Sequence, residues 1–173
     1  MELRLRLHQW EGRQPDLVAA AVAGFAAGAL LMVMELLWAG AMQGETPWRI
    51  SQLVAAISMG PYTTLHAPAN VFDPTIIGVA LLTHYVLGIA FGLILGAVVA
   101  GYHYDDDVKV SLPVIGALFG ALLYGFNFFV LTEVFPWFAE LRAWGTFICH
   151  LVFGVVAAVL YYQLTQARKR RAG

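Results

Sequence analysis

Four long apolar runs constrain this chain more than any other feature of its sequence. They cover about residues 17–42, 75–102, 110–132 and 143–165. A helix rises about 1.5 Å per residue, so about 20 apolar residues cross the hydrocarbon core of a bilayer. Each run is long enough, and none alternates between polar and apolar residues as a membrane barrel requires. The sequence therefore predicts an all-α, polytopic membrane four-helix bundle in a single transmembrane domain, residues 1–173.

The composition excludes most soluble classes of protein. The chain is 60% hydrophobic and only 12% charged, whereas soluble domains carry about 25% charged residues. Its single cysteine, Cys149, excludes an internal disulfide and metal centres that need several cysteines. A basic run at 168–171 follows the last apolar run, and positive charges at a membrane end suit anionic lipid headgroups. We therefore expect the lipid bilayer, and no nucleic acid, as a partner.

The basic residues predict the orientation of the chain in the membrane. Of the 10 Lys and Arg residues, most lie before the first apolar run or after the last one, while the connections 43–73 and 133–142 contain only Arg49 and Arg142. Basic residues favour the cytoplasmic side, so both termini are predicted to be cytoplasmic. The first run contains Glu35 and exceeds the apolar part of a signal peptide, so we interpret it as a retained span.

The connection between the first two runs contains a helical pattern of its own. Apolar residues recur at Ile50, Leu53, Val54 and Ile57, and polar residues fill the positions between them. This spacing is typical of an amphipathic helix. We expect a short helix over about 48–58 that lies at the outer membrane interface.

The two halves of the chain resemble each other. The first and third runs each contain two glycines four residues apart, and a polar residue seven positions after the second glycine. The second and fourth runs each contain a histidine with a glycine four residues later. Residues four apart share one face of a helix, and small residues there let helices approach closely. The sequence thus predicts two similar helical hairpins, related by an axis along the membrane normal. The glycines expected at the helix contacts are Gly24, Gly28, Gly88, Gly92, Gly116, Gly120 and Gly154.

The polar residues of this repeat form the candidate site. Glu35, Asn127, His84 and His150 share faces with the glycines, so they should point at neighbouring helices rather than at lipid. Each falls roughly 8–14 Å from an outer helix end at helical rise. We call these four residues the polar layer. Ionisable groups inside a membrane are costly and therefore mark functional sites.

Several interpretations of the polar layer are open. The four groups could satisfy one another and help to select which helices pair. His84 and His150 could be the axial ligands of a b-type haem between the hairpins. Glu35 and the histidines could instead handle protons or ions, with His66 and Glu133 at an outer entrance, or hold a divalent metal. The sequence contains no set of residues typical of catalysis.

The chain resembles a group of small four-span bacterial inner-membrane proteins of unestablished function, some of which carry a sodium:proline symporter label. The resemblance rests on residues 58–61 (Ser-Met-Gly-Pro), 135–138 (Phe-Pro-Trp-Phe) and 150–154 (His-Leu-Val-Phe-Gly). It implies a multi-pass protein of the bacterial inner (plasma) membrane. Sodium–solute symporters are longer and use helices broken at the midplane. No clear break is visible in these four runs, so the symporter activity is not expected.

These observations favour a non-enzymatic function. We expect a small membrane subunit or accessory protein that packs against other membrane subunits or against copies of itself. A haem-binding electron-transfer subunit is the alternative, and a proton or ion pathway is the third hypothesis.

Overall fold

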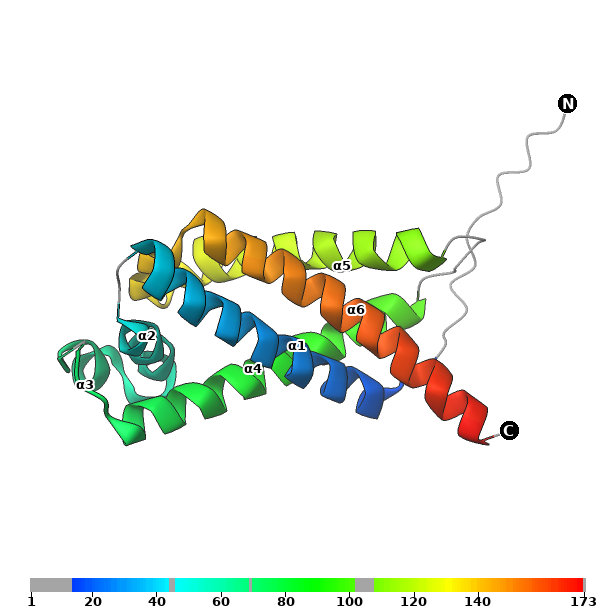
Figure 1. Cartoon of the computed structure of the whole chain (residues 1–173), viewed down its shortest axis with the longest axis horizontal. Helices are drawn as coiled ribbons and strands as arrows, with labels where there is room; N and C mark the ends of the chain where they lie inside the picture. The colour runs from blue at the N-terminus through cyan, green and yellow to red at the C-terminus, as the bar shows by residue number, and fades with distance from the viewer. Residues whose placement is uncertain (1–13, 44–45, 69, 102–107, 173) are drawn as a thin grey trace, which may run out of the picture.

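The computed structural model of the chain describes residues 14–43, 46–68, 70–101 and 108–172 (Figure 1). Within these residues the chain is helical and contains no strand, so the predicted all-α fold is confirmed. Helices long and apolar enough to cross a membrane cover Leu17–Ala41, Pro74–Gly101, Val110–Glu133 and Trp144–Arg171. The chain is a multi-pass membrane protein by the length and composition of these helices.

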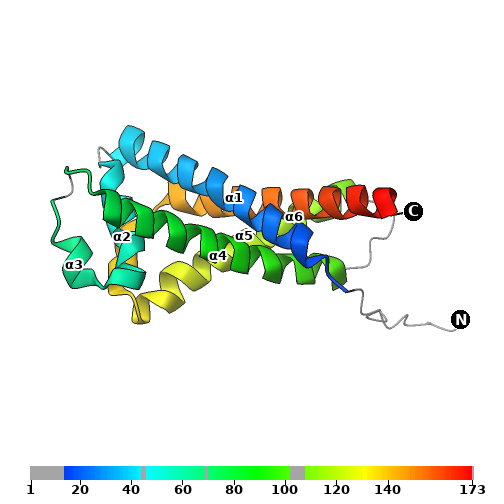
Figure 2. The same cartoon turned by 90° about the horizontal axis from the view of Figure 1, so that it is seen from below.

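The four long helices are α1 (Leu17–Trp38), α4 (Pro74–Gly101), α5 (Val108–Gly125) and α6 (Trp144–Ala172). The start of α1 and the end of α6 lie at the same end of the bundle, as an even number of spans requires (Figures 1 and 2). At this end Asp16 caps α1 by accepting a hydrogen bond from the Ala19 amide at 3.0 Å. Its carboxylate also pairs with Arg168 Nε at 2.8 Å, which ties α1 to α6.

The short elements gather at the opposite end, which we call the α2 end (Figure 2). They are α2 (Pro47–Met59), α3 (Pro61–Leu65) and two 3₁₀ turns, η3 (Leu131–Glu133) and η4 (Pro136–Leu141). Gly60 joins α2 to α3 with a φ of 85°, a backbone conformation that favours glycine. The last turns of two spans are π-helical, η1 (Ala39–Gln43) after α1 and η2 (Phe126–Val130) after α5.

Glycines stand at the crossings of both hairpins. A Cβ at Gly24 on α1 would overlap the backbone of Gly88 and Gly92 on α4, and one at Gly28 would contact the Cα of Gly88. In the second hairpin, a Cβ at Gly116 or Gly120 on α5 would overlap the α6 backbone at Gly154 or His150. The backbones of α1 and α4, and those of α5 and α6, therefore lie in direct contact. Small residues permit this approach in lipid, where no hydrophobic force drives the helices together.

The two hairpins are joined mainly through α1 and α6. The shared core contains small residues on α1 and mixed apolar residues on α6, and buried residues of α4 and α5 complete it. The contact between α5 and α4, which a two-fold axis would make equivalent to that between α1 and α6, is by comparison minor. The bundle is thus asymmetric, with α5 held mainly by α6. The fully or nearly fully buried residues at the main contact include Ala20, Ala23, Ala27, Phe153, Ala157 and Ala158.

The short helix predicted over 48–58 forms as α2, and its surroundings are protein on more than one side. Gln52, Leu53, Ala55 and Ala56 are each at most 2% exposed. The helix packs on α4, where Ser58 Oγ lies 2.8 Å from Thr83 Oγ1. The polar residue Gln52 is as buried as the apolar residues of this helix, so other parts of the protein enclose α2.

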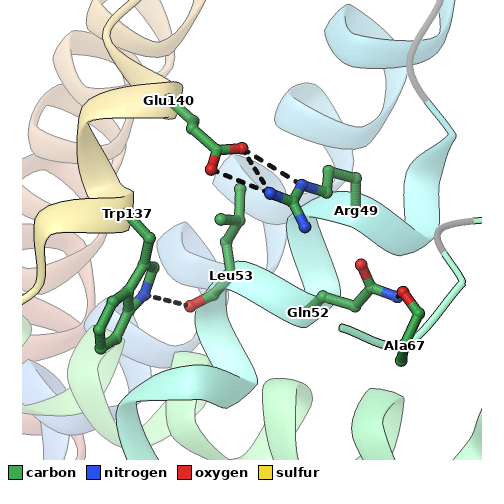
Figure 3. A network of polar contacts seen from close by, with 6 residues as sticks. All are labelled: Arg49, Gln52, Leu53, Ala67, Trp137 and Glu140. Carbon is green, nitrogen blue, oxygen red and sulfur yellow. Dashed lines mark hydrogen bonds and ion pairs between the residues drawn. The ribbon is translucent and has the colours of Figure 1, made fainter. Parts of the chain in front are cut away.

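Side chains of η4 hold α2 from the other side (Figure 3). Arg49 donates two hydrogen bonds from Nη2 and one from Nε to the Glu140 carboxylate, at 2.8–3.2 Å. The indole of Trp137 donates to the Leu53 carbonyl at 3.0 Å. These contacts link the connections of the two hairpins, which are far apart in the sequence. We call them the α2–η4 contact.

Candidate functional site

A cavity of about 80 Å³ lies among the four spans beneath α2, and all four residues of the polar layer line it. We call it the central cavity. Val54 and Ile57 of α2, together with Phe138 and Leu141 of η4, line it at the α2 end. The remaining lining residues are apolar or glycine: Gly28, Leu31, Leu87, Gly88, Phe91, Leu123, Phe128 and Phe153.

His150 is the most firmly fixed residue of the polar layer. Its ring is buried on α6, and Nδ1 lies 2.8 Å from the Thr146 carbonyl oxygen. A carbonyl only accepts hydrogen bonds, so Nδ1 carries a proton and Nε2 of the neutral ring is an acceptor. The side-chain amide of Asn127 stands 3.3 Å from Nε2 and can supply that bond. Both nitrogens of His150 are therefore engaged.

Asn127 reaches His150 from a π-helical turn. It belongs to η2, in which the backbone departs from the spacing of an ordinary α-helix. The Phe128 carbonyl in this turn accepts a hydrogen bond from Arg142 Nε at 2.6 Å, and Arg142 Nη2 also donates to Thr132 Oγ1 at 3.0 Å. The guanidinium lies 4.8 Å from the centre of the Phe129 ring, a cation–π distance. Arg142 thus stabilises the irregular turn that carries Asn127, a break that no residue type in the run had indicated.

His84 is bound to the backbone of the neighbouring span. Its Nε2 donates to the Gly28 carbonyl at 2.9 Å, across the α1–α4 crossing. The bond is possible because glycine at position 28 lets α4 come close, with the His84 ring 3.9 Å from where a Cβ would stand. Gly28, which supplies the carbonyl, is one of the glycines predicted at the helix contacts. The glycines and His84 therefore belong to the same contact between α1 and α4.

Glu35 differs from the other three groups. Its side chain is 12% exposed, and its Oε1 lies 3.9 Å from His150 Nδ1. That distance is too long for a hydrogen bond, and the Nδ1 proton is already donated to Thr146. Within the described part of the chain, the Glu35 carboxyl has no hydrogen-bond donor. A second cavity, of about 90 Å³, lies between α1, α2 and α4 and is lined by Glu35, His84 and Val54 as well.

The two predicted entrance residues lie away from this site. His66 caps α3, is exposed, and its Nδ1 contacts the Tyr62 carbonyl at 3.1 Å. Glu133 ends η3 and is also exposed. Neither residue lines either cavity. Side chains of α2 and η4 occupy the α2 end of the central cavity instead. The helical spacing of Val54 and Ile57 indicated an apolar face for α2, but not that this face covers the polar layer.

The arrangement does not suit a haem between His84 and His150. An axial ligand must offer a free nitrogen lone pair to the iron, and both nitrogens of His150 are occupied. The basic residues at the α2 end are also engaged, Arg49 with Glu140 and Arg142 with the Phe128 carbonyl. The residues present therefore do not fit this group.

A metal site and a continuous ion pathway have equally little support from the geometry. Among the described residues, no three His, Cys, Asp or Glu side chains are grouped closely enough to hold a metal ion. From the polar layer toward the terminal end, the buried residues that the structure describes are Ala, Gly, Leu, Val and Phe until Tyr161. A file of polar groups would be needed to carry ions across this part of the bundle.

Comparison of the chain with protein-family models, with curated proteins and with solved structures finds no match.

Proposed function

We propose that the chain is a non-enzymatic accessory protein, a small subunit that packs against other membrane proteins in the bacterial inner membrane. The observation that carries this proposal is the position of α5 at the margin of the bundle. In an apolar stretch of 18 residues within each span, 22% of the residues are buried for the spans of α4 and α5, compared with 39% for those of α1 and α6. Four α5 residues spaced by four are more than half exposed: Val110, Val114, Leu118 and Leu122. A helix held on one side presents its other side to lipid or to a partner helix.

The polar layer then has a structural role in this proposal. Its histidines and Asn127 bond to one another or to backbone carbonyls, which fixes α1 against α4 and α5 against α6. Such bonds contribute about 0.6 kcal/mol each on average in membranes, and they select partners and register. The positive-inside rule supports cytoplasmic termini, with the α2 end outward. The family resemblance supports a bacterial inner membrane.

Photo-crosslinking in native membranes tests this function. A photoreactive amino acid replaces Leu122 on α5, which is 74% exposed, and in a matched control it replaces Leu37 on α1, which is 67% exposed. We expect a discrete protein adduct at Leu122 and mainly lipid adducts at Leu37. Lipid adducts alone at both positions would refute the accessory role. An adduct of twice the 18.9 kDa mass would assign the α5 face to a second copy of the chain instead.

An absorption spectrum of the purified protein separates this proposal from the haem alternative. We expect no Soret band, because Nδ1 of His150 donates its proton to Thr146 and the lone pair of Nε2 accepts from Asn127. A Soret band that disappears in a His150→Ala variant would require a different arrangement of the polar layer and would favour an electron-transfer subunit.

A further inference from the structure

The central cavity combines an acidic group with aromatic walls. Glu35 provides the carboxyl, and the phenyl groups of Phe91, Phe128, Phe138 and Phe153 line other parts of the surface. Aromatic faces attract cations, most strongly where water is excluded. A carboxyl among aromatic rings is a combination that suits an organic cation.

The carboxyl of Glu35 is not used by the protein itself. Its nearest polar neighbour, His150 Nδ1, gives its proton to Thr146. Arg49 and Arg142 do not line the cavity, and their charges are directed to Glu140 and to the Phe128 carbonyl. A carboxyl group in a membrane interior loses its hydration, so it either holds a proton or, when ionised, needs a cation beside it. Within the described residues, the chain supplies neither a hydrogen-bond donor nor a fixed positive charge.

The size and lining of the cavity restrict the cation. At about 30 Å³ for each water molecule, 80 Å³ corresponds to two or three waters. The cavity can therefore admit an ion of about three non-hydrogen atoms. Three polar groups besides Glu35 line it, and two of them, Asn127 and His150, are hydrogen-bonded to each other. The rest of the lining is apolar, which favours an ammonium head on a small hydrophobic body over a strongly hydrated inorganic ion.

We propose that the central cavity binds a small alkylammonium ion, the protonated form of a short-chain amine such as ethylamine, with Glu35 as the anionic anchor. The ammonium group donates hydrogen bonds to the Glu35 carboxylate, and the body lies against the phenyl groups. Val54 lines both cavities and so stands between the central cavity and the second cavity on the other side of Glu35. This site is independent of the exposed α5 face that carries the accessory function.

Binding of ethylammonium to the full chain in lipid nanodiscs, measured by calorimetry, tests the site. Ethanol, which has nearly the same size without the charge, is the ligand control. We expect saturable binding of ethylammonium, at least tenfold weaker binding of ethanol, and at least tenfold weaker binding of ethylammonium by the Glu35→Gln variant. Glu133→Gln, an acid-to-amide change outside both cavities, should bind as the unaltered chain does.

A second variant keeps the test decisive if Glu35→Gln is poorly folded. Val54→Phe retains the carboxyl and enlarges a side chain that lines both cavities, and we expect it to lose ethylammonium binding while its helical circular dichroism is unchanged. The proposal is overturned if the unaltered chain does not bind ethylammonium, if Glu35→Gln and Val54→Phe bind it as well as the unaltered chain, or if ethanol binds equally. Displacement of ethylammonium by millimolar sodium chloride, but not by choline chloride, would assign Glu35 to an inorganic cation and would equally overturn it.

Discussion

Replacing Gly154 by alanine tests whether backbone contact at the α5–α6 crossing holds the second hairpin together. A Cβ at this position would overlap the Gly116 carbonyl oxygen and would lie 2.9 Å from both the Gly116 carbonyl carbon and the Gly120 amide nitrogen. Ordinary contacts of a Cβ begin at 3.4 Å. All three neighbouring atoms belong to the backbone, so no side chain can rotate away. The two helices must separate to accept a single methyl group.

Two opposing terms determine the size of the effect. Overpacking a tight contact costs about 1–3 kcal/mol, whereas alanine in a helix gains up to about 1 kcal/mol over glycine. The overlap at Gly154 involves several backbone atoms at once, so we take the upper part of the first range. The net loss in the free energy of unfolding is then about 1–2 kcal/mol. Equilibrium unfolding in mixed detergent micelles, followed by far-ultraviolet circular dichroism, measures this difference.

The controls are glycines with open space around them. A Cβ at Gly78 on α4 or at Gly125 at the end of α5 would meet no atom within 4 Å. Gly78→Ala and Gly125→Ala should therefore be neutral or stabilising by up to about 1 kcal/mol, from helix propensity alone. If Gly154→Ala were as stable as Gly78→Ala, close backbone contact could not be what holds α5 to α6.

Three further predictions concern the α2 end and α6. A double-mutant cycle of Arg49→Gln and Glu140→Gln should give a coupling of about 0.5–1 kcal/mol in unfolding experiments, since the side chains are 24% and 49% exposed and solvent weakens the pair; no coupling would mean that the contact does not stabilise α2. Arg142→Leu should lower the free energy of unfolding by about 1–3 kcal/mol because the Phe128 carbonyl loses a charged donor. Arg142→Lys cannot donate to both the Phe128 carbonyl and Thr132 Oγ1, so its stability should lie between that of the unaltered chain and that of Arg142→Leu. Equal stability of the unaltered chain and both variants would contradict a stabilising role for Arg142. Cys149, which is 3% exposed, should react slowly with a membrane-permeant maleimide until the protein unfolds. A Leu122→Cys, Cys149→Ala double variant provides the rate for an exposed cysteine. Labelling of native Cys149 at that rate would mean that this face of α6 is not buried.

The spans and their pairing could be predicted because both are encoded locally. Hydropathy over about 20 residues marks a span, and glycines spaced by four mark the face on which a neighbour approaches. Gly24 and Gly88 lie far apart in the sequence, and they are in contact because each lies on such a face. The common depth of Glu35 and His150 followed from counting residues from the helix ends, and the structure places both on one cavity.

The details of the site could not be predicted in the same way, because they depend on the connections between the spans. The first hairpin is joined by α2 and α3, while the second is joined by two short 3₁₀ turns. Repeated spans predict a two-fold arrangement, but the two connections are unequal, and the contact of α5 with α4 is much smaller than that of α1 with α6. The π-helical turn at Asn127 could not be predicted either. It is held by Arg142, which lies 15 positions further along the chain and donates to the Phe128 carbonyl.

The state of Glu35 therefore depends on α2 as much as on the polar layer. Val54 and Ile57 line the cavity between Glu35 and the α2 end, and the α2–η4 contact holds their helix in place. Weakening that contact should admit water to a carboxyl that otherwise has no hydrogen-bond donor within the described residues, and hydration would remove the electrostatic reason for a cation to bind there. An Arg49→Gln variant should thus bind ethylammonium more weakly although Arg49 does not line the cavity. Unchanged binding in that variant would mean that α2 remains closed without the ion pair, and that Trp137 and the Leu53 carbonyl are sufficient to hold it.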